Sequence, residues 1–389
     1  MAHARIAQAR LRSLQRQLPA VAILGPRQIG KSTLARSAFA DFTVFDLEKP
    51  ADLDRLSDDP LFVLSQHPRI ILDEAQRLPA LFPALRVLLD EHPLHRVVLL
   101  GSASPALVRQ ISESLTGRLA IFELGPISIF EGPDPEHVWL RGGFPRLHWS
   151  KPRVRPGDWY AAYVRTTLEH DVPELGFRTS SVRLRKLLTM VAHSQGSVQN
   201  LSELGGALGV DYHSVAHLLD VFEGTFLVRR LQPYFANIGK RLVKSPKLYV
   251  RDTGMLHALL GMGFSRREVL SHPKAGASFE TFCIEQIVQH ALLADPGAEA
   301  FFFRTHTGVE VDLLLRLRGR LIPIEVKLGT SPPDVGNLET CMRDLELGAG
   351  FVVTLATEPI QLRRSIWMCG LRSLLERLRL RPRSASRST

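Results

Sequence analysis

The stretch Gly25-Pro26-Arg27-Gln28-Ile29-Gly30-Lys31-Ser32 follows the apolar run 21–24 and precedes the helix-forming run 33–36. This order predicts a buried strand that passes through a glycine-rich loop into a helix. Such a loop cradles phosphate groups, because glycines let backbone N–H groups wrap around the phosphate oxygens. The lysine adds a positive charge, and the serine hydroxyl suits Mg²⁺. The stretch therefore predicts a nucleoside triphosphate site, ATP being the expected ligand, with these contacting residues: Gly25, Pro26, Arg27, Gln28, Ile29, Gly30, Lys31, Ser32 and Thr33.

Four further apolar runs follow the loop, at residues 42–47, 69–72, 97–100 and 121–124, with helical or loop patterns between them. Strands that alternate with helices form parallel sheets. The sequence therefore predicts an α/β domain built on a five-stranded parallel sheet.

Two carboxylates stand where the third of these strands ends. In the sequence Ile70-Ile71-Leu72-Asp73-Glu74 the aspartate closes a buried strand. In a chain with a phosphate loop, Asp73 at this place would hold Mg²⁺ through water, together with Ser32. Its neighbour Glu74 would polarise the attacking water. An acid pair alone also suits a solvated surface, so the interpretation depends on the phosphate loop.

Two more residues are catalytic candidates with a competing structural interpretation. Ser102 follows the fourth strand and would sense the γ-phosphate if that strand lies between the first and third; otherwise it caps the next helix. Arg118, in Thr116-Gly117-Arg118, would neutralise charge in the transition state, either within the chain or across a subunit boundary. It also suits an ordinary surface position.

The composition fits a protein with two or three folded domains. The chain has 389 residues, of which 45% are apolar and 23% charged. Its three cysteines are far apart and show no CxxC pairing, so they suggest neither a disulfide framework nor a zinc site and favour a cytoplasmic setting. No apolar run approaches the ~18 residues that span a bilayer, so no membrane association is expected. The acid-free, Arg-rich start leaves an organellar transit peptide as an alternative.

The net charge of +10 is concentrated at the two ends of the sequence. Residues 1–20 carry +4 and residues 361–389 carry +7, which leaves −1 for residues 21–360. The segment 381–389 has the composition of a disordered tail that would contact phosphates weakly or aid solubility. The body of the chain is electrically balanced, so the overall charge alone does not indicate a nucleic-acid partner.

The motifs resemble those of the prokaryotic AAA-like ATPases, whose loop reads GPRQxGKS/T and whose acid motif reads DEAQ. Here these are residues 25–32 and 73–76, and the resemblance continues through 115–118, 142–145 and 246–254. It implies an ATPase module, a winged-helix-like region and a carboxy-terminal domain that resembles PD-(D/E)xK nucleases. With the Gly- and Pro-rich stretch 132–156 as the first boundary, the expected domains are 1–150 (AAA-like ATPase), 151–255 (helical and winged-helix-like), 256–380 (α/β, nuclease-like) and 381–389 (tail).

The middle of the sequence follows a winged-helix plan. A short helix from residue 200, a turn at 209–211, a helix at 212–222 and a strand at 226–231 appear in that order. The second helix carries acids and no Lys or Arg, which argues against base reading. Basic residues of the expected wing offer nucleic acid a better surface, unless the wing is simply solvated: Lys240, Arg241, Lys244 and Lys247. The aromatic residues Trp159, Tyr160 and Tyr163 are interpreted as packing residues rather than as stacking platforms.

A third group of residues lies near the carboxy terminus. Asp312, Glu325 and Lys327 fall on two runs that read as a hairpin, and side chains two apart on a strand share a face. Glu280, on a preceding helix, would complete the set. In a nuclease of the PD-(D/E)xK type, such acids hold Mg²⁺ and the lysine orients water. The same pattern also occurs on solvated strand faces.

These observations predict a cytoplasmic multidomain ATPase that uses Lys31, Ser32, Asp73 and Glu74 on MgATP and couples the nucleotide state to its carboxy-terminal modules. Two alternatives stay open. One is a slow nucleotide-gated regulator that docks a partner protein. The other is a metal-dependent nuclease licensed by ATP. Assembly into a homo-oligomer and binding of nucleic acid through the wing and the basic termini are further open expectations.

Overall fold

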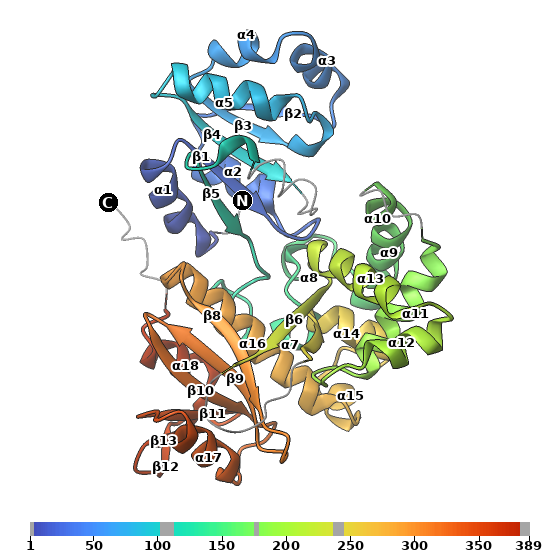
Figure 1. The fold of residues 1–389 in the computed structure, drawn as a ribbon, viewed down its shortest axis with the longest axis vertical. Helices are drawn as coiled ribbons and strands as arrows, with labels where there is room; N and C mark the ends of the chain where they lie inside the picture. Colours follow the sequence, from blue (N-terminus) through green and yellow to red (C-terminus); the bar gives the residue numbers. More distant parts are fainter. Residues whose placement is uncertain (1–3, 102–112, 175–178, 236–244, 382–389) are drawn as a thin grey trace. The chain divides into compact units, whose positions relative to one another are not determined.

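The computed structural model describes residues 4–101, 113–174, 179–235 and 245–381. They form two compact units, which we describe separately (Figure 1). The first unit comprises Met1–Ile127, Phe144–Trp149 and Gly224–Phe226; the second comprises Ser128–Gly143, Ser150–Glu223 and Leu227–Thr389. The finer division into four segments expected from the sequence stays a prediction.

The first unit is built on five strands, all paired in parallel, as the sequence predicts. In the order β2-β3-β4-β1-β5, the fourth strand in sequence lies between the first and the third. Three of the strands are buried along nearly their whole length, because short apolar runs fill the middle of a sheet covered on both faces. The bounds are β1 (Ala20–Leu24), β2 (Thr43–Asp46), β3 (Arg69–Asp73), β4 (Arg96–Gly101) and β5 (Leu119–Glu123).

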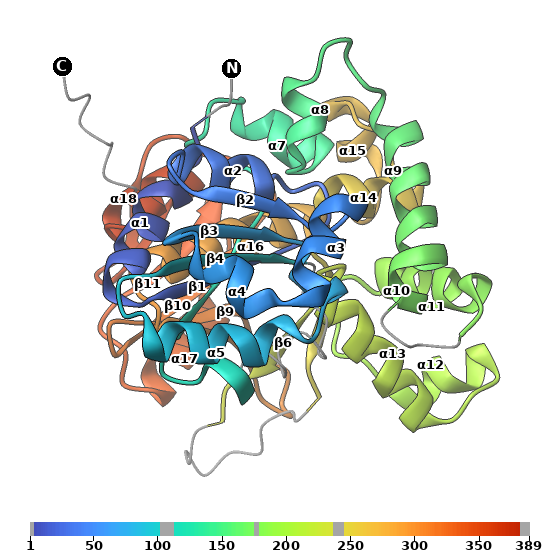
Figure 2. The same ribbon diagram turned by 90° about the horizontal axis from the view of Figure 1, so that it is seen from above.

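Helices cover both faces of this sheet, and Figure 2 shows α2 and α5 on opposite sides of its strands. Alternate residues of the strands point to opposite faces, so Ala22, Leu72 and Leu99 share one core with the residues of α3, α4 and α5. Phe226, which has a positive φ of 60°, packs against the same core. The helices of this unit are α1 (Ala7–Gln17), α2 (Lys31–Ala38), α3 (Pro50–Asp58), α4 (Pro60–Ser65), the 3-10 turn η1 (Ala75–Arg77), α5 (Leu81–Glu91) and α8 (Pro145–Trp149).

The second unit begins with a helical region. Asn200 caps α12 with its side chain, Gly209 ends that helix in the left-handed conformation, and α13 follows after a short turn. Trp159, Tyr160 and Tyr163 are buried and pack against one another, as the packing interpretation expects. The helices are α7 (Pro135–Arg141), α9 (Pro156–Thr166), the π-helical turn η2 (Thr167–Asp171), α10 (Val172–Glu174), α11 (Ser181–His193), α12 (Leu201–Leu208), α13 (Tyr212–Gly224), α14 (Thr253–Leu260) and α15 (Arg266–Ser271).

An eight-stranded mixed sheet forms the rest of the second unit, in the order β12-β13-β11-β10-β9-β8-β6-β7. The hairpin β6-β7, which follows the two helices of the expected winged helix, pairs with β8 and therefore belongs to the same sheet as the carboxy-terminal strands. The elements are β6 (Val228–Pro233), β7 (Lys247–Val250), α16 (Ala275–Ala294), β8 (Glu299–Arg304), β9 (Glu310–Leu317), β10 (Arg320–Val326), α17 (Gly336–Asp344), β11 (Gly350–Thr354), β12 (Ile360–Arg363), β13 (Ile366–Gly370) and α18 (Leu371–Arg377).

Within the described ranges, no helix has both the length and the apolar character required to cross a bilayer.

Candidate functional site

The phosphate loop lies between β1 and α2 in the first unit and depends on two glycines. A Cβ on Gly25 would lie 2.7 Å from the carbonyl oxygen of Leu124, which is too close for any side chain. Gly30 adopts a left-handed conformation (φ 96°) immediately before α2, where a side chain would be strained. The loop can therefore follow this path only with glycine at both positions. It leads directly into the amino terminus of α2, whose N–H groups favour an anion.

Lys31 is buried at the start of α2, with 6% of its surface exposed. Its Nζ donates hydrogen bonds to the carbonyl oxygens of Gly25 (2.9 Å) and Pro26 (3.0 Å). The ammonium group is thus held against the loop itself. Phosphate oxygens carry a negative charge and are stronger acceptors than these carbonyls, so an anion in the loop would compete for the same group.

Ser32 and Asp73 meet at the carboxyl ends of the strands. Asp73 is the last residue of β3, and the Ser32 side chain lies close to its carboxylate. Burial raises the pKa of Asp73 above its usual value. The polar side chain of Ser32 lowers it, and the nearby carboxylates Glu74 and Asp46 raise it further. A hydroxyl and a buried carboxylate form a hard oxygen donor pair, which is the ligand type that Mg²⁺ prefers. The pair fits this ion, and a divalent cation would relieve the crowding of negative charge.

Glu74 follows Asp73 in a left-handed backbone conformation (φ 54°) that turns the chain out of β3 into η1. Its carboxylate accepts a hydrogen bond from Nε2 of Gln76, the last residue of the DEAQ segment. The structure therefore groups Ser32, Asp73 and Glu74, with Lys31 beside them on α2.

Two predicted catalytic residues are not placed with this group. Arg118 forms a two-pronged ion pair with Asp90 (2.6 and 2.9 Å), and its carbonyl accepts from Ala20 at the amino end of β1. The phosphate loop follows the opposite, carboxyl end of β1. The five residues of this strand separate the loop from Arg118 by about 16 Å. The prediction that Arg118 acts within its own chain is thus not supported, and a role across a subunit boundary stays a prediction. Ser102 lies outside the described residues, although β4 has the position on which its sensor role depends.

Sequence reasoning missed two residues of this region. Arg5 is 7% exposed, and its guanidinium donates to the carbonyl oxygens of Ile29 (3.0 Å), Gly125 (2.9 Å) and Pro126 (3.2 Å). In the sequence, Arg5 is one of four arginines in the basic stretch 1–20, and nothing distinguishes it from the other three. Asp46, which ends β2, lies in register with Asp73. Asp46 could have been predicted from the sequence, because it lies near the end of the apolar run 42–47, as Asp73 does in its own strand.

The carboxy-terminal cluster of Glu280, Asp312, Glu325 and Lys327 is a charged group in the second unit. Lys247, which is 1% exposed, lies among these acids with Nζ 2.5 Å from Glu310 and 3.8 Å from both Glu280 and Asp312. Burial, then the charge of Asp312, raises the pKa of Glu280 to about 8. The expectation that Lys247 presents its charge to nucleic acid is therefore wrong, because its ammonium is an internal counter-ion.

Glu325 forms the other side of this cluster. Lys327 pairs with its Oε1 (2.6 Å), while its buried Oε2 has no hydrogen-bond partner within the described part of the chain. Burial, together with Asp312, raises the pKa of Glu325 to about 7. Among the described residues, no three His, Cys, Asp or Glu side chains are arranged to hold a metal ion. The four predicted residues lie near one another, and their role at a metal ion stays a prediction.

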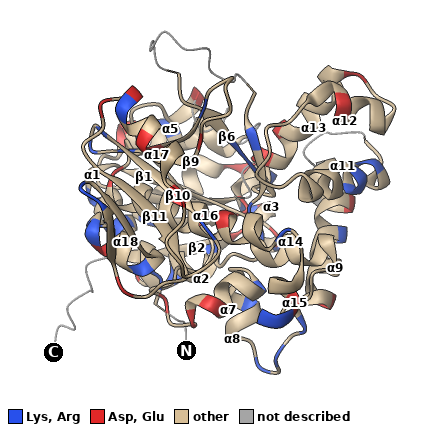
Figure 3. Ribbon diagram, turned by 90° about the horizontal axis from the view of Figure 1, so that it is seen from below, with Lys and Arg blue, Asp and Glu red and all other residues tan. Residues whose placement is uncertain are grey.

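The charges around the expected winged helix are distributed as the sequence suggests. α13 carries Asp220 and Glu223, which pair with Arg230 of β6. Arg183, Arg185 and Lys186 lie exposed on α11 instead. Figure 3 colours the basic positions of this helix blue. The expected wing residues Lys240, Arg241 and Lys244 lie outside the described residues.

Comparisons with known proteins agree with the first unit. Residues 17–132 match the family model of an AAA domain, and residues 133–266 and 275–374 match two models of domains of unknown function. An AAA domain is an ATPase domain, so the match supports ATP binding and hydrolysis in general. The uncharacterized proteins Rv2008c of Mycobacterium tuberculosis and Mb2031c of Mycobacterium bovis are each 40% identical over 348 residues, covering 88% of this chain and 78% of theirs.

Solved structures give weaker similarities. The Walker-type ATPase PABY2304 of Pyrococcus abyssi is 15% identical, with a TM-score of 0.42 over 67% of this chain and 96% of that one. The STAND protein PH0952 of Pyrococcus horikoshii, which has a tetratricopeptide repeat sensor, is 13% identical, with a TM-score of 0.22 over 76% and 51%. Both TM-scores are too low to support a statement about this chain.

Proposed function

Because this chain belongs to the same family as Rv2008c and Mb2031c and carries an AAA domain at residues 17–132, we propose that it binds MgATP at loop 25–32 and hydrolyses its terminal phosphoanhydride bond with water. The observation that carries the proposal is the position of Ser32, at the end of the glycine loop, close to the buried carboxylate of Asp73 at the end of β3. Residues from two separate motifs, 41 positions apart, thereby supply adjacent oxygen donors.

Each residue has a role that follows from its position. The backbone of the loop and the ammonium of Lys31 bind the phosphates, once this ammonium exchanges its carbonyl acceptors for phosphate oxygens. Ser32 and Asp73 hold Mg²⁺, which supplies charge neutralisation at the phosphates. Glu74 orients and polarises the attacking water.

Replacing Glu74 by glutamine tests the hydrolytic role. We expect Glu74→Gln to abolish steady-state phosphate release while the Kd for MgATP stays within a few-fold of the wild-type value, because the loop and Lys31 are unchanged. Glu91→Gln, an exposed change at the end of α5, serves as the matched control. Lys31→Ala should lose nucleotide binding. Turnover by Glu74→Gln at the wild-type rate would contradict the proposal.

The same variant separates hydrolysis from the regulator alternative. If the protein is a slow nucleotide-gated switch, Glu74→Gln should alter partner binding and change the already low turnover very little.

We further propose that the nucleotide state is coupled to the carboxy-terminal modules, with cytoplasmic location and homo-oligomerisation as accompanying expectations. Measuring the ATPase turnover with and without added DNA and RNA tests the coupling. An increase in turnover on addition of a nucleic acid would connect ATP hydrolysis with nucleic-acid binding.

The nuclease alternative depends on the carboxy-terminal cluster. The proximity of Glu280, Asp312 and Glu325 favours it. The ammonium of Lys247 among these acids, and the lack of a three-ligand group in the described ranges, argue against a divalent ion there. Incubation with Mg²⁺ or Mn²⁺ and nucleic acid decides the question, since equal lack of cleavage by wild type and Lys327→Ala would exclude nuclease activity at this site.

A further inference from the structure

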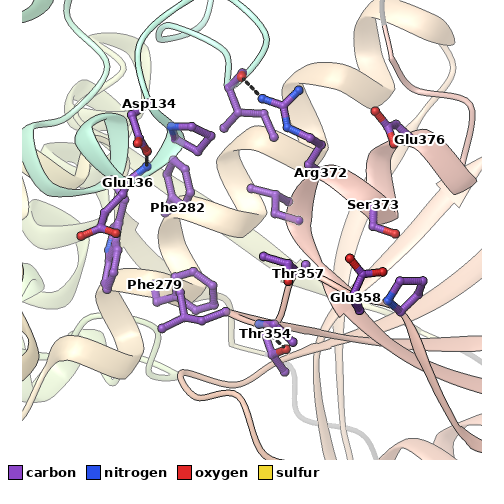
Figure 4. A pocket seen from close by; sticks show the side chains of 18 residues that line it. Asp134, Glu136, Phe279, Phe282, Thr354, Thr357, Glu358, Arg372, Ser373 and Glu376 are labelled. Atoms are coloured by element: carbon purple, nitrogen blue, oxygen red, sulfur yellow. Dashed lines mark hydrogen bonds between the residues drawn. The ribbon is translucent and has the colours of Figure 1, made fainter.

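The second unit contains a cavity of about 570 Å³, lined by residues that belong to neither site described above (Figure 4). Four segments form its walls: the start of α7, the middle of α16, the connection 354–359 between β11 and β12, and the start of α18. Its volume lies within the range of roughly 300–1,000 Å³ that is typical of small-molecule sites. The cavity is therefore large enough for a ligand.

Three aromatic side chains, Trp139, Phe279 and Phe282, form what we term the aromatic floor. They are 1%, 3% and 7% exposed. The rings of Trp139 and Phe279 meet edge to face with centroids 5.2 Å apart. The indole Nε1 donates to the hydroxyl of Ser278 (3.0 Å), which in turn lies 2.6 Å from Nε2 of His257. Packing and hydrogen bonds thus fix the aromatic floor, and its shape suits a flat apolar body.

Four carboxylates, which we term the acidic rim, also line the cavity: Asp134, Glu136, Glu358 and Glu376. Two of them have cationic partners, since Glu136 pairs with Arg266 and Glu376 pairs with Arg381. Asp134 and Glu358 form no ion pair with any other described residue. The acidic rim therefore retains negative charge that a ligand can complement.

The cationic side chain of Arg372 also lines the cavity, and it already contacts Ile129 and Phe130. Its Nη2 donates to the carbonyl oxygen of Ile129 (3.0 Å), and its guanidinium lies 4.8 Å from the centre of the Phe130 ring. Figure 4 shows Arg372 and Glu358 across the cavity from Phe279 and Phe282. A phosphorylated or carboxylate ligand would meet more negative than positive charge here.

We propose that this cavity binds a small organic cation, namely a protonated amine attached to an aromatic or aliphatic body. The apolar body would lie on the aromatic floor, and the ammonium would face Glu358 across the cavity. Every residue used here belongs to the second unit, so this proposal does not depend on the proposed ATP site.

Calorimetric titration of the full-length protein with three ligands of matched shape tests the proposal. The probes are 2-phenylethylammonium, the neutral 2-phenylethanol and the anionic 3-phenylpropionate. We expect a Kd of about 1 mM or tighter for the cation, which is within reach of nine non-hydrogen atoms, and at least tenfold weaker binding of the anion. Equal binding of all three, preference for the anion, or no binding of the cation would each overturn the proposal.

Two variants locate the binding. Glu358→Gln removes one charge of the acidic rim at an exposed position, so we expect the cation to bind about threefold to fivefold more weakly and the alcohol to bind unchanged. Glu91→Gln, in the first unit, is the matched control and should bind the cation as the wild type does. An unchanged Kd in Glu358→Gln, or equal weakening in both variants, would place the cation elsewhere and refute the assignment.

Discussion

Replacing Arg5 by methionine tests whether a residue distant in sequence holds the phosphate loop. Methionine keeps an apolar stem but removes the three hydrogen bonds to the carbonyl oxygens of Ile29, Gly125 and Pro126. At about 1 kcal/mol net for each bond, local opening of the loop becomes easier by about 3 kcal/mol. Because about 1.4 kcal/mol corresponds to a factor of ten, amide exchange of the loop should accelerate by about 100-fold.

Hydrogen exchange read by mass spectrometry on peptides that cover residues 25–34 measures this acceleration directly. A parallel titration with ATP should show weaker binding, because the ligand then has to order the loop itself. Arg16→Met, at an exposed position near the end of α1, is the control and should leave both measurements unchanged. The reasoning is refuted if Arg5→Met exchanges at the wild-type rate, or if the control accelerates equally.

Three further predictions concern single positions. Gly25→Ala should lower the affinity for ATP at least tenfold in a binding titration, because the new Cβ would lie 2.7 Å from a carbonyl oxygen. Gly206→Ala is the control: its Cβ would meet nothing within 4 Å, so the affinity for ATP should stay unchanged. Glu285→Gln should lower the free energy of unfolding, measured with a denaturant, by about 3–5 kcal/mol, because it leaves Arg229 and Arg251 without their shared carboxylate. The exposed ion pair between Glu299 and Arg316 should contribute less than about 1 kcal/mol. Burial raises the pKa of Glu280 from 4.5 to about 8, so its carboxyl binds a proton more tightly in the folded state and stability should fall as the pH rises from about 4.5 to about 8. Thermal unfolding of Glu280→Gln should show a smaller decline, and the part that remains is expected from Glu325, whose pKa is raised to about 7.

Much of the first unit follows from local sequence patterns. The strand β1, the loop 25–32 and the acid pair after β3 are each encoded within a few consecutive residues, and the parallel sheet follows from their alternation with helices. The proximity of Ser32 and Asp73 requires in addition only that β1 and β3 end at the same edge of one sheet.

What the sequence could not reveal depends on contacts between distant segments. Arg5 and Lys247 look like ordinary basic residues, and only the fold buries them among carbonyl and carboxylate groups. The pairing of β6 with β8 joins strands that are far apart in the chain, and no local pattern encodes such a pairing. Arg118 lies immediately before β5, at the amino ends of the parallel strands, and its role across a subunit boundary stays a prediction.

The first unit is assembled from three pieces of sequence, and this limits how it can be excised. Phe226 packs into a core whose other members come from residues before 127. A fragment that stops at residue 150 would leave out this ring and expose part of the apolar interior it covers. Protein engineers who want the nucleotide-binding part alone should therefore expect poor solubility from simple truncation, and a Phe226→Ala change in the intact chain should reproduce part of that defect.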